Sequence, residues 1–469
     1  MKVTDIFFFM NMFSGMGFSI LAPLFPSMAL KHGLSESLIG WILGIFAFSS
    51  TCISPFTPSL IKKFSRIKLL YFSTFCEATS TLLYGLIGFI NSYYGLLFFM
   101  FIIRIIHGCC CGIIGTVIYS LTITLSKPAE EKKALGNLEV AWCIGITTGP
   151  LFASIFYKIG GYFLPFIVLG LFLYTSFFLT TRVAQEKTES EEEIKDDPPF
   201  LKYMTHLDVL IILGVFLAGY ISQSFFYPCL SLHLKKQFDL SVSGSSLFLT
   251  IIALSNLTVL QFLDSISQKF GLYGTTCIGL VIVSLGDLMI YPYPPIPKSI
   301  FILILGFILI GGGGVPIFIP GIVSLKNTIK KIDTSIDDFT VNDITSAINF
   351  LTINIGDFLG PVVGGNLSSL LGLKNCCLIL TCFVLFYCII YFIYFHKFIF
   401  EKKKKKESKL QSDENELITH PGFYKKNTTE EILFANQEYQ PILRRNSSRP
   451  LVIISSMNEQ EYDSLNDLT

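Results

Sequence analysis

Residues 145–150 read Gly-Ile-Thr-Thr-Gly-Pro and residues 356–361 read Gly-Asp-Phe-Leu-Gly-Pro, so one Gly-x3-Gly-Pro pattern returns after 211 residues (356 minus 145). A second landmark returns at nearly the same distance. Lys-Lys-Phe-Ser at 62–65 matches Gln-Lys-Phe-Gly at 268–271, an offset of 206 residues (268 minus 62). Two unrelated landmarks that agree within five residues indicate that the chain contains a duplicated unit.

The sequence around both landmarks is strongly apolar. Of the 469 residues, 51% are hydrophobic and only 15% are charged, whereas about a quarter of the residues in a soluble chain are charged. The apolar residues form runs of about 20 with almost no charge, the length of a helix that crosses a bilayer. The composition therefore indicates a polytopic membrane protein. The balance of 35 basic against 34 acidic residues gives no global field for nucleic acid.

We expect an all-α polytopic membrane protein whose twelve transmembrane helices form two pseudosymmetric six-helix bundles, the layout of parallel-repeat transporters. The expected helices span about 5–28, 36–57, 68–91, 94–125, 136–159, 161–182, 206–230, 243–264, 272–291, 299–324, 343–370 and 373–398. The expected domains are an N-terminal bundle at 1–182, a charged cytosolic linker at 183–205, a C-terminal bundle at 206–398 and a disordered cytosolic tail at 399–469. We expect a monomer.

The basic residues of the short loops predict the orientation. Loops after even-numbered spans hold fifteen lysines and arginines, and loops after odd-numbered spans hold six. Because cytoplasmic loops are enriched in Lys and Arg, both termini and the central linker are expected in the cytosol.

The twelve cysteines do not form a metal-ligand pattern such as paired Cys-x2-Cys, and most lie within apolar runs. We interpret them as small buried apolar residues and expect no metal and no cofactor. A disulfide bridge from Cys229 to Cys376 or Cys377 stays open as an alternative.

Several motifs resemble those of the major facilitator superfamily. Gly136-x8-Gly145-x3-Gly149-Pro150 resembles its span-five antiporter motif, and Arg104-x3-Gly108 resembles its span-four motif. The segment at 58–66 resembles a degraded form of the basic loop between spans two and three, without the glycines and the Asp of that loop. This resemblance implies a secondary transporter that works by alternating access.

Within the superfamily, four segments are similar to the vesicular amine transporter group, and most of all to its vesicular polyamine transporter branch. These segments are Gly136–Glu139, Pro165–Gly170, Pro228–Leu232 and Phe238–Ser241. The whole resemblance covers about residues 5–398.

The chain also departs from this group. The monoamine and acetylcholine carriers have acids in spans one, seven and ten, where this sequence has Ser14, Tyr227 and Val315. The polyamine branch has acids at the positions of Tyr227 and His107. The lost negative charge argues against a highly cationic polyamine, and it leaves a monoamine, another organic cation or a neutral solute as alternatives.

Ionisable side chains in the predicted spans are the first candidates for a site, because burying them in hydrocarbon is costly. Glu139 lies at a position that, in the amine-transporter resemblance, faces the central cavity and is also Glu in the polyamine branch. It would bind a cationic substrate or exchange a proton; the structural alternative is a solvated Glu139 that pairs with Lys132 or Lys133. Asp357, inside the second Gly-x3-Gly-Pro pattern, is pseudosymmetric to Ile146.

Arg104 is the one basic residue expected within a span and away from its ends, and His107 lies one turn later on the same face. Arg104 would set the pKa of a nearby carboxylate, and His107 would relay protons. The structural alternative is that Arg104 bonds to backbone carbonyls and His107 packs as a neutral ring. For Glu77 and Asp287 a structural role is favoured, with Glu77 facing another helix and Asp287 close to the membrane interface near Tyr291.

Further candidates supply pocket polarity or helix mechanics. Gln223, Tyr227, Asn349 and Asn354 would make a pocket polar, although interhelical hydrogen bonds explain them equally well. The residues expected to allow close packing and bending are Gly145, Gly149, Pro150, Gly356, Gly360 and Pro361. Gly311–Gly314, followed by Pro316 and Pro320, would weaken span ten enough to make it a gate, or form a kink without motion.

The tail carries two sorting-like motifs. Asp413-x3-Leu417-Ile418 fits the acidic dileucine pattern, and Tyr462-x2-Leu465 fits the tyrosine-based pattern, so clathrin adaptors are candidate partners. Lys402–Lys406 directly follows the last span, where it would attract anionic lipid or act as positive-inside anchoring. The expected location is an intracellular vesicle, an endolysosomal membrane or the plasma membrane.

The sequence thus favours a proton-coupled antiporter of a small organic cation, an amine or polyamine-like molecule. A facilitative carrier without proton coupling is the first alternative, and a non-transporting receptor or scaffold that acts through its tail is the second. An enzyme is not expected, because no soluble domain and no nucleophile–base constellation is present.

Overall fold

The computed structural model describes residues 3–125, 131–186, 200–291, 297, 299–336, 338–419, 423–424 and 433–434. Two compact units are distinguished, Met1–Ile399 and Phe400–Thr469. The elements of the first half are α1 (Val3–Lys31), α2 (Glu36–Ile53), η1 (Ser54–Phe56), α3 (Thr57–Phe64), α4 (Arg66–Leu86), η2 (Ile87–Phe89), α5 (Tyr93–Leu125), α6 (Glu131–Gly160) and α7 (Phe163–Glu186).

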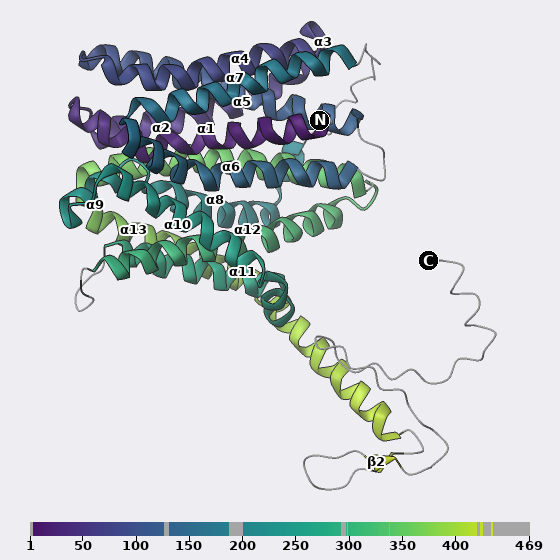
Figure 1. Cartoon of the computed structure of the whole chain (residues 1–469). Helices are drawn as coiled ribbons and strands as arrows, with labels where there is room; N and C mark the ends of the chain where they lie inside the picture. The colour runs from purple at the N-terminus through teal and green to yellow at the C-terminus, as the bar shows by residue number, and fades with distance from the viewer. Residues whose placement is uncertain are drawn as a thin grey trace. The chain divides into compact units, whose positions relative to one another are not determined.

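The helices of the second half run from teal through green to yellow in Figure 1. Its elements are η3 (Phe200–Thr205), α8 (Leu207–Phe225), α9 (Leu230–Phe238), α10 (Val242–Leu260), α11 (Leu263–Ile290), α12 (Ile300–Ile332) and α13 (Asp338–Thr419). Two short strands, β1 (Phe423–Tyr424) and β2 (Leu433–Phe434), pair antiparallel in the second unit.

Two of these helices each join two segments across one glycine. Gly271 in α11 has φ 74° and ψ 173°, and Gly372 in α13 has φ 73° and ψ 153°. Only glycine adopts such angles at little cost, so each glycine marks a sharp reversal between two helical segments. Gly372 thereby separates the predicted eleventh and twelfth spans.

Twelve spans result once these reversals are counted. Among the described residues, ten helices are long and apolar enough to cross a membrane, with α13 counted once. Dividing α13 at Gly372 and adding the more polar α4 gives twelve. The predicted fold class, two pseudosymmetric bundles of six transmembrane helices, is confirmed.

The duplication is also visible in the backbone angles. Six described residues have positive φ, and they form three pairs at the offsets found in the sequence. Gly33 and Asp239 are 206 residues apart (239 minus 33), as are Ser65 and Gly271 (271 minus 65), whereas Gly161 and Gly372 are 211 apart (372 minus 161). Each bundle therefore reverses its chain at the same three places.

Small residues bring equivalent helices of each bundle into close contact. A Cβ added at Gly149 of α6 would collide with the hydroxyl of Ser19 in α1, and one added at Gly360 of α13 would collide with the hydroxyl of Ser224 in α8. Gly145 likewise approaches the backbone of Met12. Because neither glycine carries a side chain, α1 packs on α6 and α8 packs on α13 in the same way.

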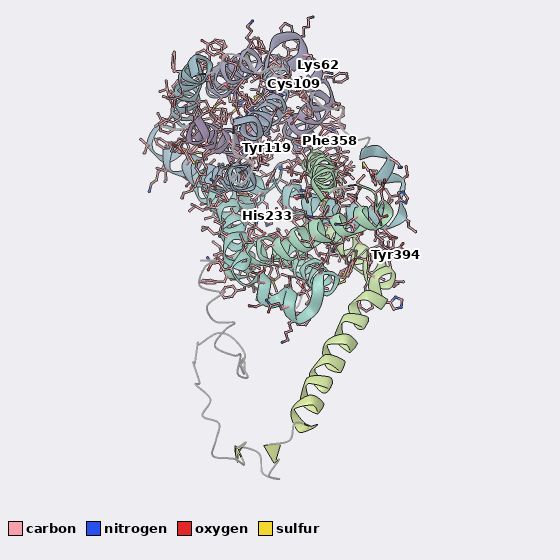
Figure 2. The ribbon with its side chains drawn as sticks, turned by 90° about the vertical axis from the view of Figure 1, so that its right-hand side faces the viewer. Lys62, Cys109, Tyr119, His233, Phe358 and Tyr394 are labelled. Atoms are coloured by element: carbon pink, nitrogen blue, oxygen red, sulfur yellow. The ribbon has the colours of Figure 1, made fainter. Side chains whose placement is uncertain are left out.

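The two bundles pack against each other through apolar side chains. A buried cluster joins Ala22 of α1 to Ile221 and Phe225 of α8 and to Ile252 of α10. Phe358 of α13 lies at the boundary between the bundles (Figure 2), where its ring packs on Phe48 of α2 at 5.3 Å.

Four hydrogen-bonded pairs join the bundles at the end of the molecule where α1 ends and α2 begins. Ser243 of α10 donates to the carbonyl of Ser154 in α6 at 2.6 Å, and Ser231 of α9 donates to the carbonyl of Pro23 at 3.2 Å. Ser37 donates to the side-chain oxygen of Asn366 at 2.6 Å, and Ser368 donates to the carboxylate of Glu36. We call these four pairs the hydroxyl latch.

Candidate functional site

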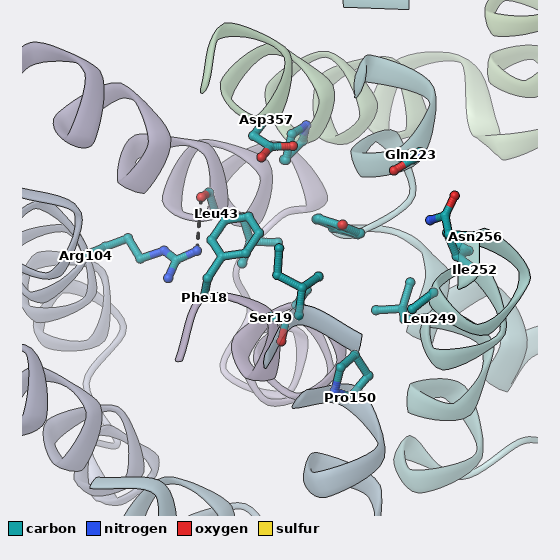
Figure 3. Close-up of a pocket in the computed structure, with 15 residues that line it drawn as sticks. Phe18, Ser19, Leu43, Arg104, Pro150, Gln223, Leu249, Ile252, Asn256 and Asp357 are labelled. Carbon is teal, nitrogen blue, oxygen red and sulfur yellow. Dashed lines mark hydrogen bonds between the residues drawn. The ribbon is translucent and has the colours of Figure 1, made fainter. Parts of the chain in front are cut away.

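A cavity of about 80 Å³ lies between the two bundles (Figure 3). Helices of both halves contribute to its lining. From the first half these residues are Phe18, Ser19, Ala22, Leu43, Arg104, Ile146 and Pro150, and from the second half Gln223, Tyr227, Leu249, Ile252, Ala253, Asn256, Asp357 and Pro361. Its volume is far below the range of about 300–1,000 Å³ for drug-sized ligands, so in this conformation the site is nearly closed.

Arg104 of α5 brings a positive charge to the cavity. Its side chain is only 2% exposed, its Nη2 donates to the carbonyl of Leu43 at 3.4 Å, and its guanidinium lies 4.5 Å from the ring centre of Phe46. Nε and Nη1 are buried and have no hydrogen-bond partner among the described residues. Arg104 therefore has two buried nitrogen atoms whose N–H groups find no hydrogen-bond acceptor among the described residues.

Asp357 brings a carboxyl group to the cavity from the opposite bundle. It projects toward the cavity from α13, while Arg104 extends toward Leu43 and Phe18 from the other side (Figure 3). Within the described residues Asp357 makes no hydrogen bond and no ion pair. Its pseudosymmetric position, Ile146, lines the same cavity, so the repeat places both positions toward the centre.

A second polar cluster lies behind Arg104, outside the cavity lining. His107 of α5 is fully buried; its Nδ1 is 2.9 Å from the hydroxyl of Tyr84, and its Nε2 is 3.9 Å from Oε1 of Glu77 in α4. Phe46 packs against the ring of His107 at 5.0 Å and against Arg104. The structure thus brings Arg104, His107 and Glu77 into one neighbourhood, with Glu77 facing α5 as expected.

Asp287, expected close to the membrane interface near Tyr291, packs inside the C-terminal bundle. The side chain is fully buried in α11, where its Oδ1 accepts a hydrogen bond from Ser222 of α8 at 2.7 Å. Its Oδ2 has no partner among the described residues. The rotation of α11 directs Asp287 into the bundle, although the residue lies only four positions before Tyr291.

The polar candidates divide between the cavity and the bundle interior. Gln223 and Tyr227 line the cavity. Asn354 donates to the carbonyl of Phe350 within its own helix at 2.9 Å, and Asn349 has a buried Oδ1 without a described partner; neither belongs to the lining.

Asn256 of α10 and Ser19 of α1 line the cavity and were not among the sequence candidates. The signal that could have found Asn256 is a lone amide within the apolar run of its helix. Of the three positions at which the vesicular amine group has acids, Tyr227 alone belongs to the lining, whereas Ser14 and Val315 are buried within α1 and α12.

The side chains of several candidates lie outside the described residues. Glu139 lies in α6, beside Leu138, whose carbonyl accepts from Asn11 at 2.8 Å, but its side chain lies outside the described residues. Asp413, Leu417 and Ile418 fall within α13 with side chains that are likewise not described, and Tyr462 and Leu465 lie outside the described residues.

The glycine-rich stretch of α12 forms close contacts within the C-terminal bundle. Gly311 approaches the backbone of Ile252 in α10, and Gly313 approaches Gly279 in α11, while α12 remains helical throughout. None of the twelve cysteines forms a disulfide bridge, which leaves Cys229 unbridged, and no group of metal-binding residues is found in the described part of the chain.

The comparisons with known proteins identify the family. A model described as Major Facilitator Superfamily matches residues 7–331. The chain belongs to the Major Facilitator Superfamily. It is therefore an integral, multi-pass membrane transporter of a small molecule, and its family and relatives are transporters rather than enzymes.

Among the relatives of this major facilitator, the MFS-type transporter SLC18B1 of Rattus norvegicus is 24% identical over 372 residues, which cover 78% of this chain and 80% of the relative. The human protein of the same name is 23% identical over 371 residues, with 78% and 79% covered. The multi-drug resistance efflux pump PmrA of Streptococcus pneumoniae is 22% identical over 261 residues, with 54% and 62% covered. The SLC18B1 matches confirm the predicted resemblance to the vesicular amine transporter group.

Solved structures support the same fold. The nucleoside transporter NupG matches with a TM-score of 0.62 at 12% identity, covering 84% of this chain and 99% of that one. A bacterial homolog to the human lysosomal transporter Spinster, in an inward-facing and occupied conformation, matches with a TM-score of 0.65 at 13% identity, covering 83% and 96%.

Proposed function

We propose that this major facilitator is a proton-coupled antiporter that moves a small organic cation, an amine or polyamine-like molecule, into an intracellular compartment. The observation that carries the proposal is Asp357, a carboxyl group without a described hydrogen bond or ion pair in a cavity shared by both bundles. An ionised carboxylate is costly in such surroundings, so it favours either a proton or a bound cation. A carboxyl group that binds either a proton or the cationic substrate, but not both at once, couples the movement of the two.

Alternating access needs two bundles that can rock about a central site. The cavity lies between the bundles, and the hydroxyl latch closes one end of that boundary. The close contacts of Gly149 with Ser19 and of Gly360 with Ser224 let each bundle move as a rigid body. We assign Glu139 a second cation- or proton-binding role from its position in α6, and Arg104 and His107 the role of tuning nearby carboxyl groups.

The test is uptake by proteoliposomes under an imposed pH gradient, with labelled tryptamine and spermidine as probes. Wild-type protein is expected to accumulate at least one probe only when the gradient is present. Asp357→Asn and Glu139→Gln are expected to abolish gradient-driven uptake, while Asp264→Asn, which changes an exposed acid at the start of α11, serves as the matched control. Uptake that ignores both the gradient and these substitutions would contradict proton coupling.

A facilitative carrier without proton coupling is the competing function, and the uncharged lining residue Tyr227, which stands where the amine carriers have an acid, favours it. Counterflow of a probe without any pH gradient, unaffected by Asp357→Asn, would support this alternative. Deletion of residues 401–469 separates transport from a scaffold role. We expect transport to survive the deletion while vesicular localisation is lost.

A further inference from the structure

The central cavity is lined by one basic and one acidic side chain that form no ion pair with each other. Arg104 reaches it from the N-terminal bundle and Asp357 from the C-terminal bundle. Within the described residues, no ion pair of 4.0 Å or less joins the two, and Asp357 receives no hydrogen bond.

Arg104 has no other anion in direct contact among the described residues. The nearby acid, Glu77, faces His107 at 3.9 Å, and the hydroxyl of Tyr84 lies 2.9 Å from the Nδ1 of the same histidine and also close to Arg104, to which it offers a neutral oxygen and no negative charge. Nη2 of Arg104 donates to a neutral carbonyl, which leaves Nε and Nη1 without acceptors in a side chain that is 2% exposed. Buried guanidinium N–H groups without acceptors are costly, and a carboxylate or phosphate satisfies them in their planar geometry.

A simple cation would satisfy only half of this cavity. Its ammonium group would neutralise Asp357 and leave the two free nitrogen atoms of Arg104 as they are. A ligand with one positive and one negative group would satisfy both walls at once, and the apolar residues Phe18, Leu43 and Ile252 would contact a short hydrocarbon linker.

We propose that the substrate of this carrier is a small zwitterion, an amine that also carries an acidic group, with its ammonium at Asp357 and its acidic group at Arg104. This inference rests on the proposed function, since it concerns the same cavity, and it narrows the substrate class. Arg104 then acts as a specificity-determining residue.

The experiment measures thermal stabilisation of the purified full-length protein by matched ligands. The probes are ω-amino acids with two to eight carbons, together with the amine and the carboxylic acid of equal length that each lack one of the two groups. At one chain length we expect the amino acid to bind about tenfold to hundredfold more tightly than either matched compound, the range expected for charge-assisted hydrogen bonds. Arg104→Gln should remove the preference over the amine, and Arg104→Lys should retain part of it.

The wild-type ligand series is decisive even if a substituted protein fails to fold. Equal stabilisation by the plain amine, or none by any amino acid of the series, would overturn the zwitterion inference. Gradient-driven uptake of tryptamine or spermidine would still stand in that case, so the two proposals fail separately. Conversely, an amino acid that binds and is transported without a pH gradient would support the substrate class and refute proton coupling.

Discussion

Glu77 in α4 and Asp287 in α11 lie in equivalent helices of the two bundles, but one turn apart, because the offset of 206 residues between Ser65 and Gly271 pairs Glu77 with Val283 (77 plus 206). Both are buried, yet their nearest polar neighbours differ: His107 for Glu77 and Ser222 for Asp287. Each of these two helices therefore carries one buried acid, and the partner of that acid decides its chemistry. A titrating ring can exchange a proton with Glu77, whereas a serine hydroxyl can only donate a hydrogen bond to Asp287.

Asp333, just after α12, has a pH dependence that can be predicted from its contacts. Its Oδ1 accepts hydrogen bonds from the hydroxyl and the backbone N–H of Ser335, its Oδ2 accepts one from Tyr203, and these bonds lower the pKa of Asp333 from its ordinary value of 3.8. Burial, and then the Asp333 carboxylate, raise the pKa of Tyr203. A lowered carboxyl pKa stabilises the fold above the unfolded value and loses that effect as the pH falls through the folded one.

We therefore expect amide hydrogen exchange at 200–205 and 333–336 to accelerate as the pH falls below about 3.8, after correction for intrinsic exchange. Asp333→Asn should make the corrected profile flat, and Asp264→Asn should leave it as in the wild type. An unchanged profile in Asp333→Asn would show that these hydrogen bonds do not set the local stability.

Residue types and their positions predicted which side chains are candidates for the site, but not which way these side chains point. Residue type alone marks Arg104 and Asp357 as costly in a membrane, and both line the cavity. The burial of Asp287 depends on the rotation of α11, and the approach of Glu77 to His107 depends on how α4 packs on α5. Neither quantity is encoded in a local pattern.

Helix number and order follow from the apolar runs, whereas several helix ends do not. The predicted span 206–230 ends at Phe225 as α8, and the chain continues as the short helix α9. The predicted span 299–324 extends to Ile332 as α12, whose last turn carries Lys330 and Lys331, where positive charge is favourable near the C-terminal end of a helix. Hydrophobicity reports the membrane-crossing part of a helix, and the polar turns beyond it are set by local capping.

Ser65, between α3 and α4, provides a test of backbone strain at the junction of two helices. It adopts φ 67° and ψ 151°, a region used almost only by glycine, and its repeat partner Gly271 adopts φ 74° and ψ 173°. The strain of a side chain there is about 1–3 kcal/mol. We expect Ser65→Gly to stabilise the protein by an amount within this range, seen as a higher melting temperature in detergent.

The reciprocal change supplies the control. Gly271→Ser should lower the melting temperature by a comparable amount, and Ser65→Ala should give no gain because alanine keeps the Cβ. A melting temperature that falls in Ser65→Gly would mean that the Ser65 side chain makes a contact worth more than the strain.

The hydroxyl latch joins the two bundles at one end of the molecule. Ser154 and Ser243 lie with their hydroxyl oxygens 3.2 Å apart, a spacing that a disulfide between cysteines at the same positions could bridge. If the bundles separate here during transport, a covalent bond at this point must stop the cycle.

We expect the double variant Ser154→Cys with Ser243→Cys to transport when reduced and to lose transport on oxidation, with recovery after dithiothreitol. Each single variant should be indifferent to oxidation, which controls for the twelve native free thiols. Full transport by the oxidised, cross-linked protein would rule out opening at this end.

The hydroxyl latch has an electrical consequence. Glu36 is the one charged side chain among the eight residues of its four pairs, and the other contacts join neutral hydroxyl, amide and carbonyl groups. Moving one elementary charge through a membrane potential of 100 mV changes the free energy by about 2.3 kcal/mol, while moving neutral dipoles changes it little. Voltage should therefore act on the latch only through Glu36, and otherwise on Arg104, Asp357 and the charges of the solute between them. Currents recorded from this protein would then report mainly the occupancy of the cavity.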